Sequence, residues 1–303
     1  GSQSAQGLKT SSPATYIEKG AKQNVLWVTK DGKKFTPLGA SSKGASPNTS
    51  GLALSFMRQP TLADIDGDGK NDIVMAYGAD IAVYRHDGTF VPGWPKTIST
   101  SCGYQGQMQQ GPAVADLNSD GNKEIIVGDN CGYLHVLDRN GNYLSGWPKP
   151  IGSTLNTPSV SDINGDGVKD IIIGDWMSKV YVYEPDGTLL PGWPQTLNYG
   201  PETYYFNMIF NGTSIGDLDR DGKEEIAVVG MACLKPEGCA PIEGERVDKL
   251  WIFRSDGSIF LGPISYPVGV LGGPILADVD LDGFLDIIMN SYNGDINVID
   301  RFG

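Results

Sequence analysis

The stretch "ADIDGDGKND" (residues 63–72) carries four carboxylates, at positions 64, 66, 68 and 72, around two glycines. Carboxylates this close together repel one another unless a cation lies among them. The same pattern returns four times, in loops that begin at Asp116, Asp162, Asp217 and Asp278. Successive first aspartates are 52, 46, 55 and 61 residues apart, so the chain is a tandem repeat with a period near fifty residues.

Within each loop, counted from its first aspartate, positions 1, 3, 5 and 9 are always Asp, Asn or Glu, and position 6 is always glycine. Position 7 varies freely, so we expect it to contribute only its backbone carbonyl. Oxygen ligands around a sharp glycine turn favour Ca²⁺, and we predict about five calcium ions, one in each loop. The predicted metal ligands are Asp64, Asp66, Asp68, Lys70, Asp72, Asp116, Asn118, Asp120, Asn122, Glu124, Asp162, Asn164, Asp166, Val168, Asp170, Asp217, Asp219, Asp221, Lys223, Glu225, Asp278, Asp280, Asp282, Phe284 and Asp286.

Other metal-binding motifs fit these loops poorly. An EF-hand requires a bidentate Glu at position 12, which here is Met75, Val127, Ile173, Val228 or Met289. The loops also lack the Cys and His that zinc prefers. The second and third loops have three carboxylates each, and we expect them to bind calcium more weakly than the others.

Each repeat predicts four short strands. A short apolar segment precedes the acidic loop, a β-branched run such as "IIVGD" follows it, and an alternating strand, an Asp-Gly or Asn-Gly turn and an outer strand complete the unit. Four strands at a fixed period indicate an all-β fold, a β-propeller of four-stranded antiparallel blades. A β-sandwich gives no reason for this period. The "GWP" residues Trp94, Trp147 and Trp193 recur on the outer strand, and we expect them to pack between blades.

The two ends of the repeat array are incomplete. Residues 24–39, "NVLWVTKDGKKFTPLG", match a third and a fourth strand, whereas the fifth repeat stops at Gly303 before its outer strand. The ring therefore has five or six blades, or is a fragment of seven, and the N-terminal hairpin completes either the last blade or a sixth one. We expect residues 1–15 to be a disordered linker with a cloning scar, and residues 16–303 to form one propeller domain.

The loop and strand pattern, and "GPAVADLNSDGNKEIIVGD" (111–129) in particular, resembles the FG-GAP or VCBS repeats of integrin-α-like propellers over residues 56–303. This resemblance implies calcium-clamped blades, secretion, and adhesion or ligand binding. Members of the family include adhesion receptors, lectin-like proteins and pilus-tip components, so the resemblance leaves the ligand open. It also leaves open a propeller that serves only as a structural domain of a larger surface protein.

Bulk composition excludes some classes of partner. A net charge of −13 argues against nucleic acid, and no apolar run is long enough to insert into a membrane. The four cysteines are either buried free thiols or two disulfides, and we favour the pairs Cys102–Cys131 and Cys233–Cys239. Disulfides place the protein outside the cytoplasm, as a secreted, cell-surface or periplasmic protein.

Function is expected on the face opposite the acidic loops. Length varies only there, in the segments 99–111, 198–212 and 232–249, and long loops on a rigid scaffold commonly bind ligands. We predict a glycan or protein partner and no catalysis, because His86 and His135 lie on or beside third strands and no catalytic pairing is visible. A polysaccharide lyase or hydrolase stays the less favoured alternative, with Glu202, Glu237, Glu243 and Glu245 on the variable face as its candidate acids. The candidate ligand contacts are Tyr104, Gln107, Trp176, Tyr199, Tyr204, Tyr205 and Tyr292.

Overall fold

The computed structural model describes most of the repeat array and parts of the N-terminal region. The described residues are 14–16, 26–28, 34–35, 59–77, 79–98, 110–152, 156–200, 206–209, 212–233, 246–266, 269–270, 272–291 and 293–303. They form strands and turns and no helix, and hence no helix that is long and apolar enough to cross a bilayer.

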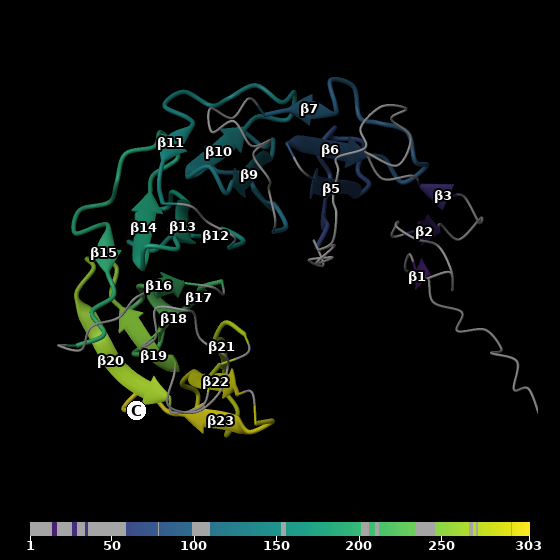
Figure 1. The fold of residues 1–303 in the computed structure, drawn as a ribbon. Coiled ribbons are helices and arrows are strands. Elements are labelled where there is room, and N and C mark those ends of the chain that lie inside the picture. Colours follow the sequence, from purple (N-terminus) through teal and green to yellow (C-terminus); the bar gives the residue numbers. More distant parts are fainter. Residues whose placement is uncertain are drawn as a thin grey trace, which may run out of the picture.

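Antiparallel sheets follow one another along an arc, with strands β1–β3 at one end and β21–β23 at the other (Figure 1). Each of the first three repeats forms a four-stranded sheet with its strands in chain order. The strands of these sheets are β4 (Thr61–Ala63), β5 (Asp72–Tyr77), β6 (Asp80–Tyr84) and β7 (Lys96–Thr97); β8 (Ala113–Ala115), β9 (Glu124–Gly128), β10 (Tyr133–Leu137) and β11 (Lys149–Pro150); and β12 (Ser159–Ser161), β13 (Asp170–Gly174), β14 (Lys179–Tyr183) and β15 (Gln195–Thr196).

The fourth repeat is larger than the others. It contains β16 (Phe206–Ile209), β17 (Ser214–Gly216), β18 (Glu225–Cys233), β19 (Arg246–Phe253) and β20 (Ile259–Tyr266). Both β16 and β17 pair with β18, and the register between β19 and β20 is shifted near Ile252. The fifth repeat forms three strands, β21 (Ile275–Ala277), β22 (Asp286–Asn290) and β23 (Ile296–Ile299). These sheets confirm the predicted all-β, propeller-type architecture, and the number of blades stays a prediction.

The acidic loops are the connections between the first and second strands of each sheet. In every repeat the second strand begins at the acid in position 9, and that acid pairs with the residue just before the loop, as Ala63 does with Asp72. The loop is therefore an eight-residue hairpin connection whose two ends are fixed by strand pairing. This geometry brings position 9 back beside position 1.

Apolar faces of successive sheets pack against each other. Trp94, Trp147 and Trp193 are 6–7% exposed and lie in three of these interfaces, as the sequence predicts. Each indole N–H donates to a backbone carbonyl of the next repeat, those of Arg139, Pro185 and Ser255, at 2.7–3.0 Å. A hydrogen bond aimed from one blade into the next fixes their relative position in a way that apolar packing alone does not.

In the fifth sheet, the apolar face that would pack against a following sheet is exposed in the described structure. Val279, Ile296 and Val298 are 53%, 71% and 49% exposed. The residues at the same register positions of the third repeat, Ile163, Val180 and Val182, are each 0% exposed because the fourth repeat covers them. In the described residues, therefore, the apolar contact that joins the other blades is missing on this side of the fifth.

The N-terminal region adds a three-stranded sheet, with β1 (Ala14–Tyr16), β2 (Leu26–Val28) and β3 (Lys34–Phe35). The pairing of Trp27 with Phe35 confirms the hairpin predicted within residues 24–39. Strand β1 is a difference from the sequence analysis, because Ala14 and Thr15 pair with Val28 and Trp27 inside the segment predicted to be a linker. Residues 1–13 lie outside the described part.

Candidate metal centre and ligand face

The five acidic loops share one set of backbone hydrogen bonds. In each loop, the carboxylate at position 9 accepts from the N–H of position 2, and the Asp at position 1 accepts from the N–H of the glycine at position 6. The side-chain oxygen at position 3 accepts from the backbone N–H of position 5, and the carboxylate at position 5 accepts from the backbone N–H of position 7. All of these bonds span 2.7–3.2 Å, so each loop turns its acidic side chains inward in the same way.

A second left-handed residue shapes every loop. Besides the glycine at position 6, position 4 has a positive φ in all five loops, between 58° and 78°. The residues at position 4 are Gly67, Ser119, Gly165, Arg220 and Leu281. For residues such as Leu281 this conformation is unfavourable, and the repeated hydrogen bonds around it hold the backbone there. Sequence reasoning missed this position because only two of its five residues are glycine.

The acid at position 9 is the most buried acidic residue of each loop. Asp72, Glu124, Asp170 and Glu225 are at most 1% exposed. Burial raises the pKa of all four carboxyl groups, to about 7 for Asp170 and Glu225. The hydrogen bond from the N–H of position 2 lowers the pKa, and neighbouring carboxylates of the loop raise it. Each of the first four loops thus holds a buried acid that is costly to ionise without a nearby positive charge.

Several loop oxygens have no hydrogen-bond donor. Asp116 Oδ1, Asp170 Oδ1 and Asp278 Oδ1 are buried and have no partner in the described part of the chain. A buried polar atom without a partner is costly, and a cation between these oxygens would satisfy them. The donor set, carboxylate and amide oxygens together with the backbone carbonyl expected from position 7, suits a hard cation.

Three of the loops bring carboxylate oxygens from three residues within 4.8 Å of one another. These groups are Asp64, Asp66 and Asp72; Asp217, Asp219 and Glu225; and Asp278, Asp280 and Asp282. The second and third loops place an asparagine at position 3, so they have fewer carboxylates to gather. The acidic clusters are compatible with metal binding at the positions predicted from the sequence.

Two arginines join the acidic loops to the Asp-Gly and Asn-Gly turns beside them. Arg85 Nε donates to Asp66 Oδ2 at 2.7 Å. Arg139 donates to the side chain of Asn122 in its own repeat at 2.7 Å, and to the backbone carbonyl of Asp66 in the preceding repeat at 3.1 Å. The loops and turns therefore share one face, as predicted, and neighbouring loops are in direct contact with a common side chain.

On the opposite face, the structure corrects one predicted ligand contact. Tyr199 is 3% exposed, its hydroxyl lies 3.2 Å from Ser178 Oγ, and its ring packs edge-on against Trp251. It is a core residue beneath its own loop and is not available to a ligand. Trp176 is half-buried in the β13–β14 turn. The other predicted contacts, Tyr104, Gln107, Tyr204, Tyr205 and Tyr292, and the acids Glu202, Glu237, Glu243 and Glu245, lie outside the described residues.

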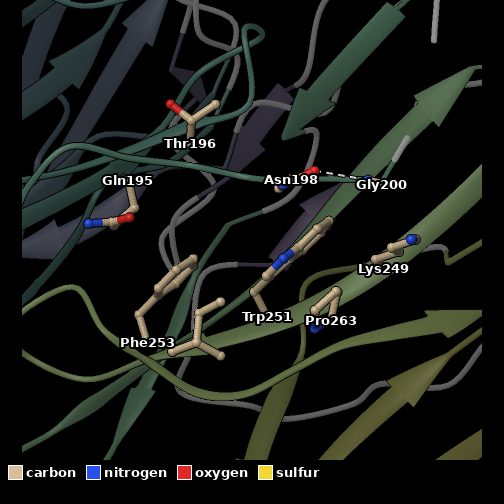
Figure 2. A pocket seen from close by; sticks show the side chains of 9 residues that line it. Gln195, Thr196, Asn198, Gly200, Lys249, Trp251, Phe253 and Pro263 are labelled. Carbon is tan, nitrogen blue, oxygen red and sulfur yellow. Dashed lines mark hydrogen bonds between the residues drawn. The ribbon is translucent and has the colours of Figure 1, made fainter. Parts of the chain in front are cut away.

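A cavity of about 330 Å³ lies between β15 and strands β19 and β20 (Figure 2). Trp251 and Phe253 line it from β19, and Thr196 and Asn198 line it from the outer strand of the third repeat and the residues after it. Lys249 also lines the cavity, at the right in Figure 2, and donates to the backbone carbonyl of Tyr199 at 2.7 Å. Asn198 and Lys249 are the first and last residues of two of the long variable segments. The cavity therefore borders one end of each of these two segments.

The one buried histidine of the described chain lies on β10 and contacts the β9–β10 connection. His135 is 2% exposed, and its ring nitrogens lie 3.1 Å from Asp129 Oδ2 and 2.9 Å from the hydroxyl of Tyr143. Asp129 also accepts the N–H of Tyr133, which closes the β9–β10 connection. The third repeat uses Asp175 and Tyr181 at the same two positions. Because the arrangement recurs with tyrosine in place of histidine, it fits a structural role.

Cys131 and Cys233, the two cysteines in the described part of the chain, are both disulfide-bonded. The partners predicted for them, Cys102 and Cys239, lie outside the described residues, so both pairings stay predictions.

A family model described as an FG-GAP-like repeat matches residues 64–127, 116–173 and 162–228. Each match begins at the first aspartate of one acidic loop and ends within the second strand of the next repeat, so the loop and its hairpin are what the model recognises. The chain belongs to the FG-GAP-like repeat family. No curated protein matches the sequence.

Solved structures of propeller type resemble this FG-GAP-like chain at low sequence identity. A europium-containing methanol dehydrogenase matches with 15% identity over 76% of this chain and 47% of its own, at a TM-score of 0.51. The C-terminal domain of Pseudomonas aeruginosa PilY1 matches with 13% identity over 81% of this chain and 72% of its own, at a TM-score of 0.50. The V. cholerae biofilm matrix protein Bap1 has 16% identity over 80% of this chain and 59% of its own, at a TM-score of 0.35. These likenesses concern the fold alone.

Proposed function

We propose that this FG-GAP-like chain is a calcium-stabilised β-propeller module that acts outside the cytoplasm and binds a glycan or a protein through its long-loop face. The observation that carries the calcium assignment is the repetition of one preorganised acidic loop five times, with buried carboxylate oxygens left without donors. Calcium supplies the positive charge that these carboxylates lack, and its oxygen chemistry tolerates their varied geometry.

In this proposal the ions stabilise the fold and do not contact the ligand. A cation in a loop joins the first and second strands of its sheet, so its binding free energy adds to the stability of the folded chain. We expect the long variable segments to lie on the other face. The cavity beside Trp251 borders the ends of two of them, where the exposed Thr196 and Asn198 and the partly buried Lys249 offer hydrogen bonds to a sugar or a protein side chain.

The test is a glycan array probed with the purified chain in millimolar calcium. We expect a defined set of glycans to bind, and binding to weaken at least about fivefold in a Lys249→Gln, Asn198→Ala variant at the cavity rim. His86→Ala, an exposed position on the acidic-loop side, is the matched control and should bind as the wild type does.

Three outcomes would redirect the assignment. Binding that survives the rim substitutions but is lost in the His86 variant would place the ligand site on the acidic-loop face and contradict the proposal. An array with no bound glycan, together with no binding to candidate surface proteins, would favour the second function, a structural propeller domain of a larger surface protein. Hydrolysis or elimination products from an acidic polysaccharide would instead favour an enzyme, which we do not expect.

A further inference from the structure

The first acidic loop differs from the others in the described chain because an arginine is paired with its position-3 carboxylate. Both oxygens of Asp66 are engaged, Oδ1 by the N–H of Asp68 and Oδ2 by Arg85 Nε at 2.7 Å. The pair is largely shielded from solvent, with the side chains of Arg85 and Asp66 31% and 12% exposed. In the described part of the chain, no other position-3 carboxylate has an ion pair.

The fourth loop is a natural comparison, because it has the same residue types at positions 1, 3, 5 and 7 and an acid at position 9. Arg254 occupies the position of Arg85 in the turn, and the backbone hydrogen bonds around the two arginines are the same. Yet Arg254 turns away from Asp219. Its guanidinium lies 4.8 Å from the centre of the Phe260 ring and donates to the backbone carbonyl of Ile259.

The residue three positions after the turn glycine accounts for this difference. It is Phe260 in the fourth repeat and Val91 in the first, where Val91 is buried in the core. An arginine gains from stacking on an aromatic ring, and Val91 offers no such surface. Arg85 is therefore left to pair with the nearest carboxylate, which belongs to the acidic loop.

From this geometry we infer that Arg85 is a built-in counter-ion of the first loop, which competes with calcium for Asp66 and makes this loop a weaker calcium site than the fourth. The inference rests on the proposed function, since it assigns different calcium affinities to loops with matching ligands. To offer Oδ2 to a calcium ion, Asp66 would have to give up its hydrogen bond from Arg85 Nε. Without calcium, the same arginine offsets the repulsion among Asp64, Asp66 and Asp72.

Calcium-binding isotherms of the wild type, Arg85→Met and Arg254→Met test this inference. We expect Arg85→Met to tighten one site about three- to tenfold, the range of a partly shielded ion pair, and to leave the other sites unchanged. Arg254→Met should give the wild-type isotherm. In an Asp66→Asn background, Arg85→Met should have no effect, which assigns the change to the first loop.

A second readout is the melting temperature in excess chelator, which we expect Arg85→Met to lower and Arg254→Met to leave unchanged. If the isotherms of Arg85→Met and wild type coincide while calcium still binds, the inference is wrong and the proposed function stands. If no variant binds calcium at millimolar concentration, the proposed function itself fails.

Discussion

The buried acid of the third loop allows a prediction whose sign depends on whether calcium is present. Asp170 is 0% exposed, and its pKa is raised to about 7, first by burial and then by Glu184, Asp166 and Asp162. The folded chain therefore holds a proton that the unfolded chain releases at its ordinary pKa of 3.8. Between these two values, the unfolded state binds fewer protons, so the metal-free chain loses stability as pH rises from about 4 to about 7.

The size of this loss follows from the pKa shift. At about 1.4 kcal/mol for each pKa unit, ionising Asp170 in the folded chain costs up to about 4 kcal/mol by pH 8. Asp170→Asn removes the charge and keeps an oxygen to accept the N–H of Ile163, which Asp170 Oδ2 does now at 3.0 Å. In excess chelator at pH 8, we expect this variant to be more stable than the wild type by up to about 4 kcal/mol, and about equal to it at pH 4.

In calcium we expect the wild type to be more stable than Asp170→Asn. The ion offsets the charge of Asp170 in the wild type, whereas the variant has one anionic ligand fewer to bind it. The assay is urea unfolding at pH 4, 6 and 8, in chelator and in millimolar calcium, with Asp256→Asn as control. Asp256 is an exposed turn residue whose pKa is lowered by Ser258, so its substitution should not stabilise the chain at any pH. A metal-free Asp170→Asn chain that is no more stable than wild type at pH 8 would refute the reasoning.

Three further predictions concern stability. Trp193→Phe should cost about 1–3 kcal/mol in urea unfolding, because the indole N–H no longer reaches Ser255 and the interface loses volume; a cost below about 0.5 kcal/mol would contradict the interface role. Val182→Asp should lower the free energy of unfolding by at least about 3 kcal/mol. Val298→Asp, at the equivalent but 49% exposed position, should lower it by less than about 0.5 kcal/mol, and equal losses would mean that this face of the fifth sheet is covered in solution. In millimolar calcium, stability should fall as pH drops toward about 4, the opposite slope to the metal-free chain, because protons compete with the ion for the loop carboxylates; parallel pH profiles would count against bound calcium.

Much of the repeat could be predicted because its signals are local. The spacing of acids and glycine predicts the hairpin connection, and the β-branched run after position 9 predicts the second strand, which begins at that acid in all five repeats. The period predicts the four-stranded sheets. The recurring tryptophans could be placed between blades because they share a register, and the structure confirms this placement.

What could not be predicted depends on contacts between distant residues. Tyr199 belongs to a variable segment, and only its contact with Trp251, fifty-two positions later, explains why it is buried. Leu281 has no local reason to adopt a positive φ, and the hydrogen bonds of the surrounding loop impose it. Arg85 and Arg254 have the same place in the turn motif, and their different partners follow from one core residue, Phe260 or Val91.

The most direct test of the cation assignment is a crystal structure from calcium-containing solution, with anomalous diffraction to locate the ions. We predict one peak in each of the five loops, with oxygens of positions 1, 3 and 5 and the carbonyl of position 7 at about 2.3–2.6 Å from it. Loops that contain only water, or that are filled by Arg85 and other basic side chains, would contradict the account.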